Sequence, residues 1–215
     1  MNLLAQVSAG GVLAAVVVDS PEHAVPLGRA LLAGGLGVME VTFRNVHAAE
    51  CVRRIRAEVP AMTVGAGTLL TPGQVDAARA AGAQFGVSPG FNPMVVRHAM
   101  ADGFAFIPGT LTPGEMEQSV ELGCPLVKFF PAAAAGGPAY LKAVAAPYAH
   151  TPLRIIPLGG VNEHNLADYL RLSLVAAVGG SWLGDRALMA AGRWEEITAL
   201  TRRALAAAVH ARAAS

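Results

Sequence analysis

The sequence predicts an α/β fold, a single (β/α)8 TIM barrel over residues 1–215 with a short N-terminal helix. Short apolar runs that end near Gly, Pro, Ser or Thr alternate with Ala/Leu-rich stretches of helical spacing along the whole chain. Eight such runs occur, too uniformly apolar to have a wetted face. This pattern favours parallel strands covered by helices. The length suits one domain, and no linker divides it.

In chain order, residues 1–8 predict a short helix that closes one end of the barrel, and the Ala/Arg-rich tail from Arg193 predicts the last helix. The predicted strands are Leu13–Val18, Val38–Phe43, Thr63–Ala66, Phe85–Ser88, Ala105–Ile107, Leu126–Phe130, Arg154–Leu158 and Leu174–Val178. Capping side chains beside proline or acid predict helix starts after several of them, at Ser20, Thr71, Asn92, Thr112 and Asn162. An open doubly wound sheet is the alternative, but no G-x-G-x-x-G motif follows the first strand.

Composition argues against several classes of protein. Hydrophobic residues make up 53% of the chain and charged residues 14%, which is too apolar for disorder. No uncharged apolar run reaches the roughly 20 residues that cross a bilayer. The net charge of +1, without a basic stripe, predicts neither a nucleic-acid nor a membrane partner. Cys51 and Cys124 lack metal-ligand spacing and predict reduced thiols in a cytoplasmic protein.

A lysine lies within the sixth predicted strand. The chain has only two lysines, Lys128 and Lys142, against 14 arginines, so an amine inside the apolar run 126–130 is unusual. Burial disfavours the charged ammonium, and a neutral amine can form a Schiff base with a ketone, as a guanidinium cannot. The alternatives are a lysine that extends to solvent at a strand end and one that pairs with a structural carboxylate.

The second predicted strand offers a partner for this lysine. Glu40, Thr42 and Arg44 occupy alternate positions, so their side chains point to the same face of that strand. Strands two and six lie opposite each other in the predicted barrel. Glu40 and Lys128 can therefore meet near the axis. Active sites of such barrels lie at the carboxyl ends of the strands, which favours a catalytic pair over a salt bridge that only holds the core.

Two glycine pairs follow the last two predicted strands, in Leu158-Gly159-Gly160 and Gly179-Gly180-Ser181. Backbone N–H groups and a hydroxyl at these positions form the usual phosphate cradle of this fold. The six histidines fall in predicted helices or loops, and none forms a metal triad with Asp, Glu or Cys. The sequence therefore predicts a site for a phosphorylated substrate, without a metal.

Motifs occur in order along nearly the whole chain. They are Glu22-His23-Ala24-Val25-Pro26, Glu40-Val41-Thr42 with Arg44, Val64-Gly65-Ala66-Gly67-Thr68, Ser88-Pro89-Gly90, Val127-Lys128-Phe129-Phe130-Pro131, Gly159-Gly160 and Gly180-Ser181-Trp182-Leu183. Together they resemble the class I 2-keto-3-deoxy-6-phosphogluconate (KDPG) aldolases. The resemblance implies a homotrimeric, metal-free barrel enzyme without a cofactor, which splits KDPG into pyruvate and glyceraldehyde 3-phosphate. Many members also cleave 4-hydroxy-2-oxoglutarate.

Position by position, the resemblance implies that Lys128 forms the Schiff base and that Glu40 is the general acid and base. It implies contacts to the pyruvate carboxylate from Arg44 and Thr68, with Phe130 packed beside the lysine. The implied phosphate contacts are Gly159, Gly160, Gly180 and Ser181.

Two departures from the family pattern stand out. Leu158 occupies the position where the family commonly has a threonine that touches substrate hydroxyls. An apolar residue there resembles the galactonate-type branch, whereas Arg44 resembles the gluconate type. The end of the first strand, Val18-Asp19, lacks the basic residue that many members carry nearby.

Two other functions suit the same predicted barrel. A phosphosugar isomerase or epimerase would use Glu40 as a base and need no imine on Lys128. A non-catalytic binder of phosphorylated sugar acids would tolerate arginine in place of that lysine. Fold analogy alone does not separate these functions, because this barrel supports many chemistries.

Overall fold

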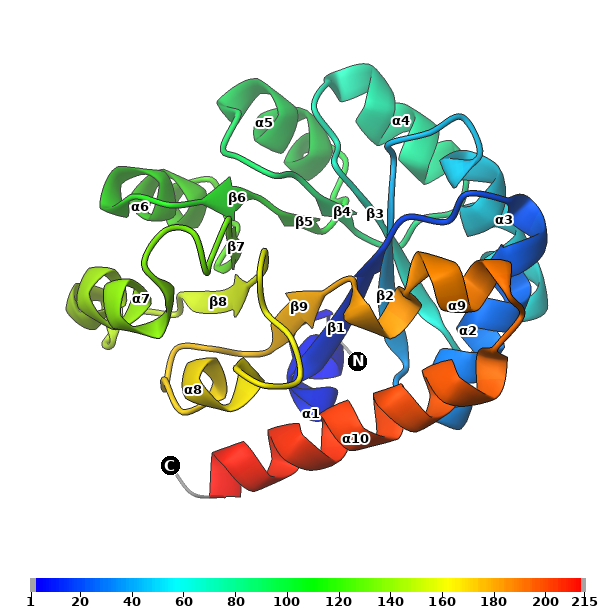
Figure 1. Cartoon of the computed structure of the whole chain (residues 1–215). Coiled ribbons are helices and arrows are strands. Elements are labelled where there is room, and N and C mark those ends of the chain that lie inside the picture. Colours follow the sequence, from blue (N-terminus) through cyan, green and yellow to red (C-terminus); the bar gives the residue numbers. More distant parts are fainter. Residues whose placement is uncertain (1–2, 214–215) are drawn as a thin grey trace.

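The structure, a computed structural model, describes residues 3–213 and shows an α/β fold built on parallel strands (Figure 1). Six strands form one curled sheet in the order β5-β4-β3-β2-β1-β9, and three form a second sheet in the order β6-β7-β8. Helices surround the strands on the outside (Figure 1). The predicted α/β class is confirmed.

The strands are β1 (Val12–Val16), β2 (Val38–Thr42), β3 (Thr63–Gly67), β4 (Gly86–Val87), β5 (Phe106–Ile107), β6 (Gly109–Thr110), β7 (Leu126–Phe129), β8 (Arg154–Pro157) and β9 (Val178–Gly180). The α-helices are α1 (Leu3–Gly10), α2 (Ala24–Ala33), α3 (Ala48–Glu58), α4 (Pro72–Ala80), α5 (Pro93–Ala101), α6 (Pro113–Glu121), α7 (Gly137–Ala145), α8 (Leu166–Leu170), α9 (Arg186–Ala190) and α10 (Trp194–Ala213). The 3-10 helices are η1 (Pro21–His23), η2 (Ala146–Tyr148) and η3 (Trp182–Gly184).

The strand hydrogen bonds differ from the closed eight-stranded barrel that the sequence predicts. The fifth predicted strand, Ala105–Ile107, is found as β5, and a further strand that was not predicted, β6, follows Pro108, because proline has no N–H to donate to a ladder. The last predicted strand, Leu174–Val178, is displaced to β9, and only Val175 forms a bridge, to Ile155 of β8. The apolar run 174–177 is buried nonetheless. What the structure shows is two parallel sheets rather than one closed ring of strands.

Proline-associated caps begin three helices at the predicted places. The Thr71 hydroxyl accepts a hydrogen bond from the Gln74 N–H at the start of α4, and the Asn92 side chain accepts one from Met94 at the start of α5. Thr112 begins α6 with a capping box. The prediction at Asn162 is early, because α8 begins only at Leu166, and Ser20 precedes a 3-10 helix without capping it.

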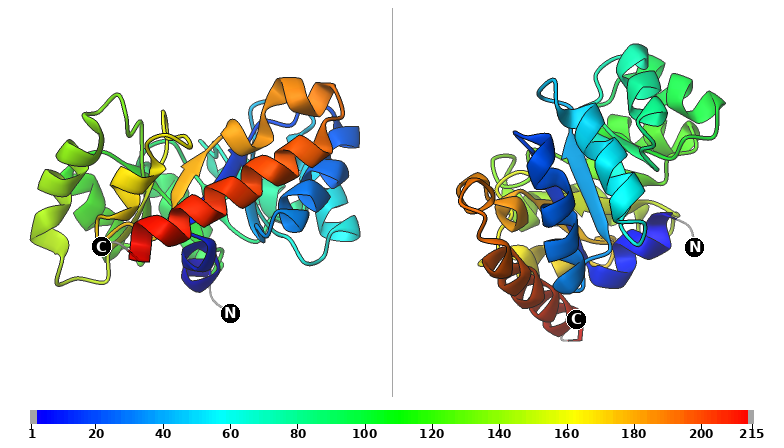
Figure 2. Two further views of the ribbon diagram at one scale, coloured as in Figure 1. Left: turned by 60° about the horizontal axis from the view of Figure 1, so that its bottom comes forward. Right: turned by 90° about the vertical axis from the view of Figure 1, so that its right-hand side faces the viewer.

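The C-terminal helix joins distant parts of the chain. α10 runs along one side of the molecule and packs against α2 and α8 (Figure 2). Its Thr198 hydroxyl donates to the Ala30 carbonyl, and its Arg212 donates to the carbonyl of Ser8 in α1. The predicted N-terminal helix is found as α1, and its first two predicted residues lie outside the described residues. Within residues 3–213, no helix combines the length and apolar character that a membrane crossing requires.

Candidate active site

A cavity of about 550 Å³ opens at the carboxyl ends of the strands of both sheets. Nine of the ten predicted site residues line it: Glu40, Arg44, Lys128, Phe130, Leu158, Gly159, Gly160, Gly180 and Ser181. The tenth, Thr68, lies beside the cavity and is hydrogen-bonded to Arg44. The structure therefore gathers side chains from five separate stretches of sequence in one place.

Lys128 and Glu40 come from different sheets and meet inside the molecule. The Nζ atom of Lys128, on β7, lies 4.0 Å from Oε1 of Glu40, on β2, and the two side chains are 5% and 0% exposed. A buried salt bridge that stabilises a core needs close geometry and further hydrogen bonds. This separation is longer than a hydrogen bond. Both groups are thus close enough to exchange protons with the same bound molecule. Their separation is too long for a strong structural ion pair.

The carboxylate of Glu40 has no other protein partner. Both of its oxygens are buried, and neither accepts a hydrogen bond from any residue between 3 and 213. Leaving a buried acceptor unsatisfied costs about 1–3 kcal/mol, more when it is charged. Such groups in a cavity are typical of functional sites, where a substrate supplies the missing partner.

Phe130 shapes the surroundings of the lysine. The Nζ atom of Lys128 lies 5.0 Å from the centroid of the Phe130 ring, within the range of a cation–π contact. Both side chains point to the same side of the chain because they lie two positions apart at the end of β7. The ring also borders Gly159, where a Cβ atom would approach it to 3.0 Å. Phe130 therefore forms an apolar wall between the amine and the glycine loop.

Arg44 and Thr68 form a second polar pair. The Arg44 Nε atom donates to the Thr68 hydroxyl at 3.1 Å, which joins the loops after β2 and β3. Thr68 has a φ of +60°, in the left-handed region that non-glycine residues rarely adopt. With this backbone conformation the Thr68 hydroxyl accepts the hydrogen bond of Arg44, so Thr68 holds Arg44 beside the cavity. Strain at such a position is typical of functional loops.

The two glycine loops expose backbone donors to the cavity. Gly159 and Gly160 both have positive φ, of 87° and 80°, which only glycine adopts easily. Among the described residues, the N–H groups of Gly159, Gly160 and Ser181 donate to no backbone carbonyl. At Gly180, a Cβ atom would lie 2.1 Å from the Trp182 ring. The loops are thus suited to hold an anion by N–H groups and the Ser181 hydroxyl.

Sequence reasoning missed part of the cavity wall. Trp182, Asp185 and Arg186 all line it, from η3 and the start of α9. Trp182 belongs to a motif that the sequence analysis identified, and its position directly after Ser181 could have placed it here. Nothing in the local pattern around Arg186 distinguishes it from the other exposed arginines of the chain.

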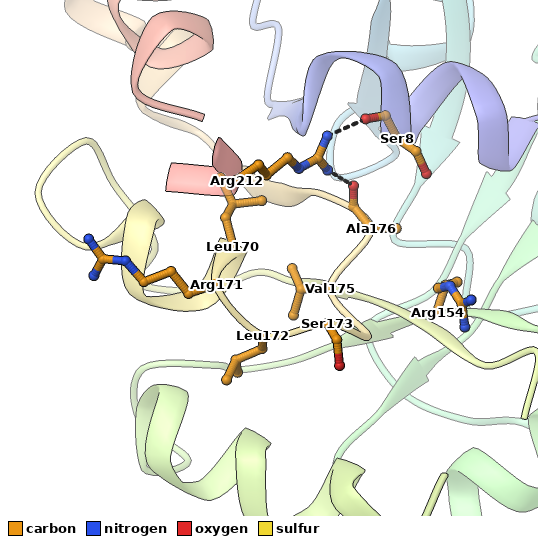
Figure 3. Close-up of a pocket in the computed structure, with 9 residues that line it drawn as sticks. All are labelled: Ser8, Arg154, Leu170, Arg171, Leu172, Ser173, Val175, Ala176 and Arg212. Carbon is orange, nitrogen blue, oxygen red and sulfur yellow. Dashed lines mark hydrogen bonds between the residues drawn. The ribbon is translucent and has the colours of Figure 1, made fainter. Parts of the chain in front are cut away.

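A second cavity, of about 410 Å³, lies at the opposite end of the strands (Figure 3). Arg154, Arg171 and Arg212 line it, but their guanidinium groups diverge in Figure 3. That of Arg212 donates to the carbonyls of Ser8 and Ala176, and that of Arg171 pairs with Asp168. This cavity is therefore a seam between α10 and its neighbours. Within residues 3–213, no three His, Cys, Asp or Glu side chains gather as metal ligands anywhere.

A buried amine beside a buried carboxylate, with an anion cradle across the same cavity, defines an α/β enzyme site suited to a phosphorylated carbonyl compound. Comparison with known proteins supports this class. The family model for KDPG and KHG aldolase matches residues 4–200. The 2-dehydro-3-deoxy-phosphogluconate aldolase of Treponema pallidum is 47% identical over 194 residues, which span 90% of this chain and 91% of that protein.

Two solved structures are also similar. The KDPG aldolase of Legionella pneumophila, with pyruvate captured at low pH as a covalent carbinolamine intermediate, has a TM-score of 0.88 and 36% identity, covering 94% of this chain and 97% of that one. The KDPG aldolase of Zymomonas mobilis with 3-phosphoglycerate has a TM-score of 0.86 and 35% identity, covering 96% of both chains. The chain belongs to the KDPG and KHG aldolase family, which confirms the resemblance predicted from its motifs.

Proposed function

We propose that this chain is a class I aldolase, a lyase that cleaves KDPG to pyruvate and glyceraldehyde 3-phosphate and also accepts 4-hydroxy-2-oxoglutarate. The observation that carries this proposal is the buried pair of Lys128 and Glu40, whose Nζ and Oε1 atoms lie 4.0 Å apart in the cavity. The covalent pyruvate intermediate in the similar Legionella protein supports imine chemistry here.

In the proposed reaction, neutral Lys128 attacks the C2 ketone of the substrate to form a carbinolamine. Glu40 carries the protons that allow loss of water and formation of the protonated imine. The imine accepts the electron pair as the C3–C4 bond breaks. Glu40, directly or through a water, takes the proton of the C4 hydroxyl, so that the aldehyde leaves. Reprotonation of the enamine at C3 and hydrolysis of the imine release pyruvate and free Lys128.

The remaining cavity residues bind the two ends of the substrate in this proposal. Arg44, held by Thr68, contacts the carboxylate of the pyruvyl end, because a guanidinium matches the geometry of a carboxylate. Phe130 shields the imine from water. The phosphate lies on the loops that contain Gly159, Gly160, Gly180 and Ser181. The free N–H groups of these loops support that assignment.

Leu158 bears on which epimer is the natural substrate. Its side chain is buried and lines the cavity, and it occupies the space that a Cβ atom on Gly179 would otherwise fill. A leucine offers no hydrogen bond to a substrate hydroxyl, so the site does not select gluconate stereochemistry through this residue. We therefore propose that the chain also cleaves 2-keto-3-deoxy-6-phosphogalactonate, and comparison of kcat/KM for the two epimers tests this.

The fold around the site is proposed to be one closed barrel forming a single domain over residues 1–215. The Lys128 N–H donates to the Pro108 carbonyl, which connects β7 to the break between β5 and β6. Ile155 of β8 pairs with Val175 ahead of β9, and the buried apolar residues form one continuous core. These contacts support closure at the two places where the ladder is interrupted.

We further propose a homotrimer in the cytoplasm. Val46, Leu70 and Met94 are 90%, 51% and 69% exposed, on segments that follow the neighbouring strands β2, β3 and β4. Large apolar side chains gathered on one rim are typical of association surfaces. The two buried free cysteines support a reducing compartment. Light scattering of the purified protein measures the oligomeric state.

Incubation with pyruvate and sodium borohydride, followed by peptide mapping by mass spectrometry, tests the proposed function. A reduced pyruvyl adduct on Lys128 is the expected result. A folded protein without the adduct would contradict it and point to the isomerase or the non-catalytic binder. Release of pyruvate from KDPG, followed with a coupled dehydrogenase, then tests the cleavage itself.

A further inference from the structure

We propose that Arg186 binds the phosphate group of the substrate and that Asp19 positions it, an inference that rests on the proposed function of the same cavity. Arg186 begins α9, two positions after the end of η3, and it lines the cavity together with Gly159, Gly160 and Ser181. These loop residues offer the phosphate only neutral donors. Arg186 adds a positive charge and a planar set of N–H groups that match phosphate oxygens.

The other basic side chains of the cavity belong to other strands. Three cationic side chains line it, Arg44, Lys128 and Arg186, among the residues that the structure describes. Lys128 is buried beside Glu40, and Arg44 donates to Thr68 across the loops after β2 and β3. The glycine loops follow β8 and β9 instead. A phosphate carries up to two negative charges at neutral pH, and Arg186 is the cation that belongs to their side of the cavity.

Asp19 fixes the orientation of this guanidinium. The Arg186 Nε atom donates to Asp19 Oδ2 at 2.6 Å, and Nη2 donates to Oδ1 at 2.7 Å. This side-on, two-point contact uses one edge of the guanidinium. It leaves Nη1 without a hydrogen bond to any described residue, so both of its protons are available to a ligand. Asp19 lies after β1, and it thereby attaches the start of α9 to the strand between β2 and β9.

The exposure of the pair indicates a binding role rather than a structural one. The Arg186 side chain is 66% exposed and that of Asp19 is 47% exposed. Exposed ion pairs of this kind contribute little to stability. The other carboxylate at this wall, Asp185, is engaged in capping α9, where it accepts a hydrogen bond from the Leu188 N–H. The geometry thus presents a held, solvent-facing cation at the mouth of the cavity.

Recognition by Arg186 makes the enzyme selective for phosphorylated substrates. The comparison that isolates this selectivity uses KDPG and 2-keto-3-deoxygluconate, which differ only by the phosphate group. For Arg186→Gln we expect the KM for KDPG to rise by about 10- to 100-fold, the loss of one charge-assisted contact, with kcat little changed. The KM for the unphosphorylated compound should stay the same. Arg186→Lys should retain part of the affinity, because a lysine keeps the charge but not the fork.

Arg171→Gln is the matched control. Arg171 is similarly exposed, pairs with Asp168, and lies away from the active-site cavity. It should leave the KM for both substrates unchanged. Asp19→Asn should raise the KM for KDPG less than Arg186→Gln does. The double variant Asp19→Asn with Arg186→Gln should bind no worse than Arg186→Gln alone, because a positioning residue acts only through the group it positions.

Calorimetric titration with inorganic phosphate tests the cation without turnover. Weaker phosphate binding by Arg186→Gln than by Arg171→Gln is the expected result, and equal binding would overturn the inference. An unchanged KM for KDPG in Arg186→Gln would do the same. A penalty from Asp19→Asn that persists without Arg186 would refute its positioning role. Pyruvate labelling of Lys128 does not involve the phosphate, so absence of that adduct in the wild type reports failure of the proposed function instead.

Discussion

Gly67 leaves the space that the Glu40 carboxylate occupies. A Cβ atom on Gly67 would lie 1.7 Å from Glu40 Oε1, although the residues belong to neighbouring strands, β3 and β2. Gly65 pairs with Glu40 in the ladder, so Gly67 is its diagonal neighbour on the same face. Gly65 in turn makes room for the ring of Phe85. The small residues of β3 are therefore explained by the packing of Glu40 and Phe85 around them.

We predict that Gly67→Ala displaces the Glu40 carboxylate and lowers kcat by at least about tenfold, because general acid–base catalysis depends on the position of the proton carrier. Overpacking of the core should also cost about 1–3 kcal/mol of stability. Steady-state kinetics and urea unfolding measure the two effects. Gly73→Ala is the control, since a Cβ atom there meets nothing within 4 Å. Equal kcat values for the two variants would contradict the prediction.

The proposed catalytic pair, Lys128 and Glu40, gives a second prediction. Lys128→Arg keeps a positive charge but cannot form an imine, so turnover and the pyruvyl adduct should both disappear. Glu40→Gln should slow turnover by about 10² to 10⁴ if this carboxylate is the sole proton carrier. Single-turnover kinetics and mass spectrometry measure these losses. Substantial activity in Lys128→Arg would remove the covalent mechanism, and an unimpaired Glu40→Gln would remove that residue from its role.

The sequence predicted the elements where burial and hydrogen bonding coincide. Along Val38–Thr42 every residue is buried and paired with β3, and Met39, Glu40 and Val41 are also paired with β1, so the apolar pattern locates β2 well. The run 174–177 is just as apolar and is buried without forming a strand, except for the single bridge at Val175. Apolar character indicates that a segment is buried but not that it pairs with a neighbouring strand. The last strand was therefore predicted at Leu174–Val178, ahead of its observed position, β9. Pro108 can be recognised in the sequence, but whether it interrupts a strand depends on how the neighbouring β7 pairs with the residues around it.

The residues of the candidate site were also predicted only in part. That Lys128 and Glu40 meet in one cavity was predictable, because ionisable side chains inside apolar strands are rare. Arg186 was not, because its partner Asp19 lies 167 residues away in the chain and its five-residue helix has an ordinary surface composition. Thr68 was predicted to lie near Arg44, as it does, but its left-handed backbone could not be predicted from a threonine.

Glu115 gives a prediction on acid stability. Burial raises the pKa of this carboxyl, but hydrogen bonds from the Leu111 and Thr112 N–H groups and the Thr112 hydroxyl outweigh burial, so the pKa lies below its usual range. Because the pKa is lower in the folded state, the ionised carboxylate stabilises the protein at pH values above the unfolded pKa of about 4.3. This stabilisation is lost as the pH falls through the folded-state pKa. Glu115→Gln should therefore cost about 0.5–2 kcal/mol at pH 7, and the difference should shrink toward pH 3.

Urea unfolding of Glu115→Gln and the wild type at both pH values measures this. Glu121→Gln is the control: Glu121 ends the same helix, is exposed, and its side chain makes no hydrogen bond or ion pair with the described residues. It should show a smaller effect at pH 7. A difference between Glu115→Gln and the wild type that is the same at pH 7 and pH 3 would show that the charge of Glu115 is not what stabilises the capping box.

The two cysteines give a prediction about alkaline pH. Burial raises the pKa of Cys51 and of Cys124 to about 11, and both side chains are almost fully enclosed. The thiolate is the reactive form, so iodoacetamide should not modify the native protein at pH 8 but should label both residues in guanidinium chloride. A folded-state pKa above the unfolded value of about 8.5 leaves stability intact below that pH and reduces it as the pH rises toward 11. Mass spectrometry of the labelled peptides measures the reactivity, and rapid modification of either cysteine in the native protein at pH 8 would contradict the enclosed, protonated state.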